Sequence, residues 1–283
     1  MIADSHCHAW RRWPYPPLPP DEDSRGRVEQ LLYEMDCHDV EFAVLVSAEI
    51  TGNPDNNDYG AAIAARYPTR LRHFVDVDSS WSPTYHTAGA AGRLRQLYDA
   101  YRPAGITHYL GSTNDGWLRS PEADSFFATA ETLGVVLSLS VATCWQADLR
   151  VLAGRHPDLT VLCHHLGLPA PGSRPDGADL AEILASAAVP NIVLKASGFH
   201  YVSSTSWDHP WSDALALFRV LFEAYGPARL CWGSDFPASR RFCTYRQSLE
   251  VLRTHASFLS SADREAILGG TLAAILADTH PPA

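Results

Sequence analysis

Short apolar segments alternate with longer amphipathic segments along the whole chain, and this alternation restricts the possible folds more than any other feature. The apolar segments have the length and the residue content of buried strands. Eight of them are predicted to be strands: residues 2–8, 41–47, 71–77, 105–110, 135–141, 159–165, 191–197 and 229–235.

The segments between these strands have helical periodicity. Val28, Leu31, Leu32 and Met35, for example, follow the i, i+3, i+4, i+7 spacing of an amphipathic helix. Further helices are predicted over residues 58–67, 88–100, 122–133, 145–155, 179–187, 212–225, 245–255 and 261–277.

Strands that alternate with helices predict an α/β protein with a parallel sheet closed into a single (β/α)₈ TIM barrel. An open, doubly wound sheet is the alternative, but no GxGxxG follows the first predicted strand. The length of 283 residues suits one barrel, and we expect residues 1–283 to form a single domain.

Charge and cysteine content narrow the classes of partner and compartment. The formal net charge of −10 disfavours nucleic-acid binding, which needs a basic surface. No run of about 18 apolar residues predicts a membrane span, and the start MIADSH does not resemble a signal peptide. The six cysteines lack CxxC spacing, which favours reduced thiols and a cytoplasmic location. We therefore expect neither nucleic acid nor a membrane as partner. The expected partner is a small-molecule substrate, and whether the chain forms a homo-oligomer is left open.

The sequence DSHCH places two imidazoles one residue apart in the first predicted strand. Successive side chains of a strand alternate between its faces, so Asp4, His6 and His8 are expected to point the same way. At a rise of 3.3 Å per residue, His6 and His8 would lie about 7 Å apart along the strand, close enough to converge on one ion or substrate atom.

Other ionisable residues fall at the predicted carboxyl ends of strands, where TIM barrels have their active sites. His165 lies at the end of the sixth strand and Asp235 at the end of the eighth, while His164 is expected to face away from His165. Lys195, the only lysine of the chain, lies within the apolar seventh strand.

The segments DSHCH, TVLCHHLGLP, NIVLKASGF and RLCWGSDFP, in this order, resemble the amidohydrolase superfamily. The resemblance is closest to its lactonase-like branch, which includes 2-pyrone-4,6-dicarboxylate lactonase and sugar lactonases, and it spans nearly the whole chain. It implies that His6, His8 and Asp235 are the metal ligands of metal-dependent members. It also implies that His165 is a catalytic histidine and that Asp235 deprotonates the attacking water.

One departure from this pattern concerns the metal. Many metal-dependent members have a histidine at the end of strand five, where this chain has Ser138 and Ser140. Two schemes therefore stay open. In one, a divalent ion (zinc or manganese) held by His6, His8 and Asp235 activates water. In the other, Asp235 is the general base without a metal, and the histidines polarise the carbonyl as hydrogen-bond donors.

Further residues at strand ends and in the following loops are candidates for substrate binding. A guanidinium can hold a substrate carboxylate through two hydrogen bonds, and an amine can stabilise developing negative charge. The candidates are Arg11, His108, Tyr109, Lys195, His200 and Arg240.

The predicted function is a hydrolase that opens a lactone or similar cyclic ester of a small, carboxylated or polyhydroxylated molecule by attack of activated water. The catalytic residues would be His6, His8, His165 and Asp235. The alternatives are a metal-dependent decarboxylase of an aromatic or muconate-like acid, a biosynthetic tailoring amidohydrolase, and a barrel that only binds its ligand.

Overall fold

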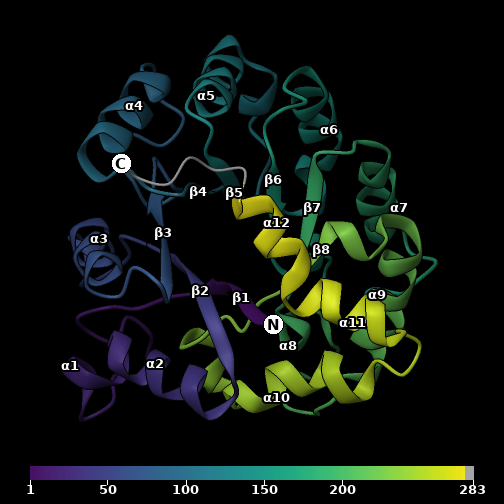
Figure 1. The fold of residues 1–283 in the computed structure, drawn as a ribbon. Helices are drawn as coiled ribbons and strands as arrows, with labels where there is room; N and C mark the ends of the chain where they lie inside the picture. Colours follow the sequence, from purple (N-terminus) through teal and green to yellow (C-terminus); the bar gives the residue numbers. More distant parts are fainter. Residues whose placement is uncertain (278–283) are drawn as a thin grey trace.

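The computed structural model describes residues 1–277 and shows a ring of parallel strands surrounded by helices (Figure 1). The strands form one eight-stranded sheet in sequence order, and each pairs with the next in parallel. They are β1 (Ile2–Cys7), β2 (Val40–Val46), β3 (Leu71–Asp76), β4 (Gly105–Tyr109), β5 (Val136–Ser140), β6 (Val161–Cys163), β7 (Ile192–Ala196) and β8 (Leu230–Trp232). Each of the eight predicted ranges contains or overlaps its observed strand, and the predicted TIM barrel is confirmed.

The helices also follow the predicted order. The principal ones are α2 (Val28–Cys37), α3 (Asn56–Arg66), α4 (Ala90–Tyr101), α5 (Pro121–Thr132), α6 (Gln146–Arg155), α7 (Ala178–Ala185), α9 (Ser212–Tyr225), α10 (Tyr245–Glu250), α11 (Ser261–Glu265) and α12 (Thr271–Ala277). Short helices α1 (Glu22–Arg25) and α8 (Phe199–Val202) lie in the segments after β1 and β7. Two π-helical stretches, Val251–His255 and Ala266–Gly270, extend α10 and join α11 to α12, so the predicted helices 245–255 and 261–277 are continuous but irregular.

The interior of the barrel is apolar at the amino ends of the strands and polar at their carboxyl ends. Ala3, Phe74, Val136 and Cys231 form part of a buried cluster at the amino ends. Leu272 of α12 belongs to the same cluster, and Figure 1 shows α12 lying across this end of the barrel. Hydrocarbon thus fills one end, and chemistry is confined to the other.

The first and last strands meet at a short seam rather than a regular ladder. The backbone N–H of Asp235 donates to His6 O at 2.7 Å, and that of His8 donates to Phe236 O at 2.6 Å. These bonds fix Asp235 beside His6 and His8, which are more than two hundred residues earlier in the sequence.

Strand β1 contains a register irregularity that separates Asp4 from the two histidines. Asp4 pairs with Ala43 and Cys7 with Leu45, so β1 has one residue more than β2 across this interval. Asp4 accepts hydrogen bonds from the backbone N–H groups of His6 and Ser234 and from the Tyr245 hydroxyl. The expectation that Asp4 shares the histidines' face is wrong, because the extra residue interrupts the alternation; Asp4 instead holds the seam together.

Within residues 1–277, no helix has both the length and the apolar character needed to cross a bilayer. The cytoplasmic location stays a prediction.

Candidate active site

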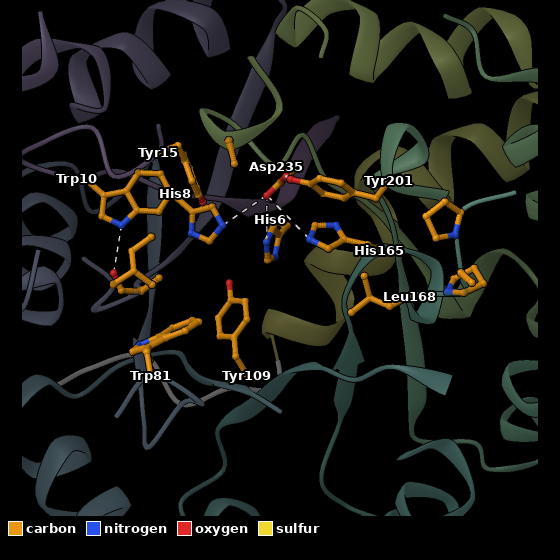
Figure 2. A pocket seen from close by; sticks show the side chains of 16 residues that line it. His6, His8, Trp10, Tyr15, Trp81, Tyr109, His165, Leu168, Tyr201 and Asp235 are labelled. Carbon is orange, nitrogen blue, oxygen red and sulfur yellow. Dashed lines mark hydrogen bonds and ion pairs between the residues drawn. The ribbon is translucent and has the colours of Figure 1, made fainter. Parts of the chain in front are cut away.

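Three histidines converge on one oxygen of Asp235 at the carboxyl end of the barrel (Figure 2). The Nε2 atoms of His6 and His8 each lie 3.5 Å from Asp235 Oδ1, and Nε2 of His165 lies 4.0 Å from it. All four side chains are buried. The structure therefore brings together the four residues that the sequence analysis named as catalytic.

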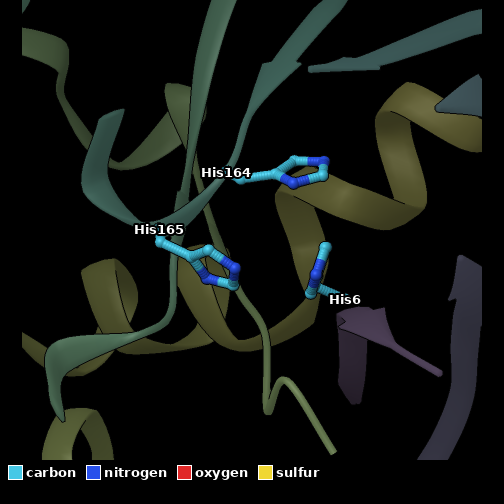
Figure 3. Close-up of side chains that lie close together, drawn as sticks. All are labelled: His6, His164 and His165. Atoms are coloured by element: carbon cyan, nitrogen blue, oxygen red, sulfur yellow. The ribbon is translucent and has the colours of Figure 1, made fainter. Parts of the chain in front are cut away.

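The backbone at His165 and Asp235 is strained. Their φ angles are +46° and +55°, in the left-handed region that side chains with a Cβ rarely adopt. Alternation from Leu162, which belongs to the interior cluster, turns His164 inward, and the left-handed turn at His165 brings that side chain inward as well. The His164 ring lies 4.4 Å from the His6 ring, centre to centre (Figure 3). Its Nε2 lies 2.7 Å from Ser138 Oγ. The expectation that His164 faces away is wrong for this reason.

Each of the three converging imidazoles is held through its other nitrogen. His8 Nδ1 donates to the carbonyl oxygen of Val46 at 2.7 Å, and His165 Nδ1 lies 3.0 Å from Ser197 Oγ. His6 Nδ1 lies 2.9 Å from Lys195 Nζ. These contacts orient the rings, so that the Nε2 atoms face Asp235.

Lys195 lies beneath the cluster, completely buried. Besides His6, its amine contacts Ser138 Oγ at 2.6 Å. Burial lowers the pKa of Lys195 to about 7. An ammonium group has no lone pair and can only donate to His6 Nδ1. A neutral amine can instead accept a hydrogen bond from Nδ1–H, which leaves Nε2 of His6 with a free lone pair.

The electrostatics favour neutral His6 and His165 beside an ionised Asp235. Burial lowers the pKa of His165 to about 4 and that of His6 well below its usual value. Burial alone would raise the Asp235 pKa, but the neighbouring imidazoles, His165 first, outweigh it and lower this pKa to about 2. Tyr201 donates to Asp235 Oδ2 at 2.7 Å, which occupies the second oxygen.

These atoms fit a divalent metal. When Nδ1 of His8 donates its hydrogen to the Val46 carbonyl, Nε2 of the ring has a free lone pair. This lone pair lies 3.5 Å from Asp235 Oδ1, which is also an acceptor. Two acceptors at this distance repel each other unless a cation or a proton lies between them. His6 Nε2 is likewise buried and has no hydrogen-bond partner among the described residues. Ligand atoms of a tetrahedral zinc site are about 3.4 Å apart, given bonds of about 2.1 Å. The distances of 3.5 Å from Asp235 Oδ1 to His6 Nε2 and to His8 Nε2 match this spacing, and all donor atoms of the three residues lie within 4.8 Å of one another.

A cavity of about 610 Å³ opens above the cluster. Figure 2 shows the rings of Trp10, Tyr15, Trp81, Tyr109 and Tyr201 around it. The remaining lining residues are His6, His8, Ala48, Ile50, His165, Leu168, Pro169, Ala170, Pro171, Asp235 and Ala238. The space is therefore an aromatic chamber with one polar wall.

The six residues predicted to bind substrate are placed differently from one another. Tyr109 lines the cavity, and Lys195 contacts His6 from below. The other four do not line it: His108, His200, Arg11 and Arg240. His108 Nδ1 lies 2.9 Å from Val77 O on the outer side of its strand, and His200 stacks on Phe242.

The two arginines of this set are occupied elsewhere. Arg11 forms an ion pair with Asp55 at 2.9 Å, and Arg240 lies over the Phe236 ring. Because neither side chain lines the cavity, their positions do not support substrate contact. A loop residue that follows a strand can face the outer helices as readily as the cavity.

Sequence reasoning did not single out several residues that line the cavity. Tyr15 comes from the proline-rich segment after β1, and Leu168 to Pro171 follow β6. The available signal was general: segments after the carboxyl ends of strands form the walls of such sites. Which side chains turn inward depends on turns that the sequence pattern does not encode.

The wall residue Trp81 is anchored by an acidic pair that gives a pH-dependent stability. Its indole N–H donates to Asp76 at 2.9 Å, and the backbone N–H of Glu49 donates to the same oxygen. Burial raises the pKa of Asp76 to about 6; burial, followed by the charge of Asp76, raises the pKa of Glu49 to about 7.

We expect Glu49→Gln to weaken the dependence of stability on pH. An acidic group whose pKa is higher in the folded than in the unfolded chain stabilises the folded state. This stabilisation is complete at pH values below the pKa of the unfolded chain, and it is lost as the pH rises through the pKa of the folded chain. In the wild type, the urea concentration at the unfolding midpoint should therefore decrease as the pH is raised from 5 to 8. This decrease should be smaller in Glu49→Gln. Glu265→Gln, at an exposed position, is the control; an equal fall in all three proteins would contradict the assignment.

The chain is similar to known proteins in sequence and in fold. Residues 3–276 match the family profile described as Amidohydrolase. The chain is 33% identical over 146 residues to an L-fucono-1,5-lactonase of Burkholderia multivorans (strain ATCC 17616 / 249). That alignment covers 47% of this chain and 48% of the lactonase, so it spans about half of the relative's length.

Two crystal structures have a similar fold over nearly their whole length. One is a probable 2-pyrone-4,6-dicarboxylic acid hydrolase from Acinetobacter baumannii with citric acid bound (TM-score 0.77, 19% identity, 98% of this chain and 99% of that one). The other is an amidohydrolase from Burkholderia multivorans with bound zinc (TM-score 0.77, 23% identity, with the same coverage). At these identities the likeness concerns the fold. Because the family profile extends over residues 3–276, this chain belongs to the amidohydrolase family.

Proposed function

We propose that this protein is a hydrolase that opens a lactone or similar cyclic ester by attack of activated water. The observation that carries the proposal is the convergence of three Nε2 atoms on Asp235 Oδ1 at the floor of a cavity large enough for a small molecule. The similarity to an L-fucono-1,5-lactonase supports the choice of a lactone. We also propose that residues 1–283 act as one domain.

Asp235 holds the proton that the attacking water loses. Its carboxylate is ionised at neutral pH, and the Tyr201 hydroxyl fixes its orientation through Oδ2. The water oxygen forms a bond to the acyl carbon, the ring acyl–oxygen bond then breaks, and the leaving oxygen takes up the proton from Asp235. The products are a hydroxyl group and a carboxylic acid in one open chain.

His6, His8 and Asp235 would hold a divalent metal, and His165 lies next to this set. When bound, the metal would polarise the carbonyl and lower the pKa of water to about 7, within reach of a carboxylate that is itself a weak base. Val46 O, Lys195 and Ser197 hold the three rings in place for this role. Zinc or manganese as the ion is a proposal, supported by the donor set and by the zinc-bound relative.

Removal of the metal is expected to abolish most of the activity. Protein purified without added ions is analysed for metal content, dialysed against a chelator and assayed on a panel of lactones. We expect hydrolysis to fall at least 100-fold and to return with zinc or manganese. Full activity in protein with no bound metal would instead support the scheme in which Asp235 and the histidines act alone; acid release from no lactone at all would contradict the proposed function.

A further inference from the structure

The cavity offers very few hydrogen-bonding groups beyond the histidines and Asp235. Among the described residues that line it, none is Arg, Lys, Glu, Asn, Gln, Ser or Thr. The indole N–H groups already have partners: Trp10 donates to Ala48 O at 3.2 Å, and Trp81 donates to Asp76 at 2.9 Å. The Tyr201 hydroxyl donates to Asp235. The hydroxyl groups of Tyr15 and Tyr109 are the side-chain groups left for a substrate.

Positive charge lies behind the wall rather than in it. The Arg241 guanidinium packs over the Tyr15 ring, 4.3 Å from its centre, and Arg11 is paired with Asp55. A substrate carboxylate inside the chamber would thus be desolvated with no bidentate partner, which is strongly unfavourable.

The aromatic side chains form a surface suited to a flat ring. The Trp81 and Tyr109 rings lie 4.7 Å apart, centre to centre, and the Trp10 and Tyr15 rings lie 5.6 Å apart (Figure 2). Such rings bind planar apolar groups through stacked and edge contacts. The cavity volume of about 610 Å³ leaves room for a substituted two-ring molecule.

We infer that the substrate is an uncharged aryl lactone, whose aromatic ring packs against Trp81, Tyr109 and Tyr15 while its carbonyl meets the histidine–aspartate cluster. This departs from the carboxylated or polyhydroxylated molecule expected from the sequence. A sugar lactone carries several hydroxyl groups, and each one buried without a partner lowers binding by about tenfold or more. The inference rests on the proposed lactone-opening reaction, in which the phenolic oxygen is the leaving group and takes up the proton from Asp235.

The test compares three substrates with the metal-loaded enzyme: 3,4-dihydrocoumarin, L-fucono-1,5-lactone and 2-pyrone-4,6-dicarboxylate. We expect kcat/KM for dihydrocoumarin to exceed each of the others by about 100-fold or more. Trp81→Ala should raise KM for dihydrocoumarin about tenfold. Trp207→Ala, which removes an exposed ring that does not line the cavity, should leave KM unchanged. A higher kcat/KM for either of the other two lactones would overturn the inference.

A binding measurement separates this inference from the proposed reaction. The lactam 3,4-dihydroquinolin-2(1H)-one has the shape of dihydrocoumarin and resists hydrolysis, and its affinity is measured by calorimetry. One outcome is that no lactone is opened, while the lactam binds to the wild type and about tenfold more weakly to Trp81→Ala. The proposed function would then fail, and the inferred binding of an uncharged aryl ring in the cavity would stand. If the lactam does not bind at millimolar concentration, the inference is overturned whatever lactones are opened.

Discussion

Replacement of Asp235 by Asn is expected to lower kcat/KM for lactone hydrolysis by about 10²–10⁴-fold. The amide has the same shape and can still accept the Tyr201 hydrogen bond, but it cannot take a proton from water or hold a cation beside His6 and His8. Kinetics on the best lactone, together with the thermal unfolding midpoint, would check this, because the fold should be retained.

Two further variants make this result specific. Tyr201→Phe removes one hydrogen bond to Asp235 Oδ2 and should lower kcat/KM by about tenfold or less. Asp208→Asn changes an exposed carboxylate and should have no effect. The proposed role of Asp235 would be untenable if a folded Asp235→Asn protein kept a third or more of wild-type activity.

Replacement of Lys195 by Met is expected to lower activity or metal affinity by about 10- to 100-fold. Met fills a similar volume, so His6 keeps its packing but loses the partner of Nδ1, which lies 2.9 Å from Nζ. The ring is then no longer held with Nε2 toward Asp235. Zinc affinity measured with a competing chelator reports on this directly, and a purely structural role of the amine would leave it unchanged.

Stability gives the complementary readout for Lys195. A buried amine costs free energy to desolvate, so its replacement by an apolar side chain should lower the free energy of unfolding by no more than about 1 kcal/mol. Ser138→Ala removes the other partner of the amine and leaves the contact with His6, so a smaller loss of metal affinity is expected. Wild-type metal affinity and activity in Lys195→Met would contradict the positioning role.

Local periodicity was sufficient for the order and approximate bounds of the elements. Strands β6 and β8 are continuous apolar runs because helices and the barrel interior bury both of their faces. The spacing of His6 and His8, and their place on the first strand, was equally readable, since both depend on residues adjacent in the chain. The position of Asp235 could be expected from its place after the last strand and from the family resemblance.

Alternation failed as a guide where the strands end. It placed Asp4 with the histidines and His164 away from them, and neither holds. An extra residue in β1 changes the direction of Asp4. His164 faces inward with Leu162, and the left-handed turn at His165 brings His165 to the same side. The same limitation applies to Arg11 and Arg240, whose side chains leave the cavity for Asp55 and Phe236.

The sequence by itself determined the barrel and the residue types at its open end, because buried periodicity is a property of neighbouring residues. Only the tertiary structure decided that three imidazoles meet one carboxylate oxygen, and that the chamber above them is lined by aromatic rings rather than arginines. The physical reason is that loop turns and the closing seam between β1 and β8 depend on contacts between residues far apart in the chain.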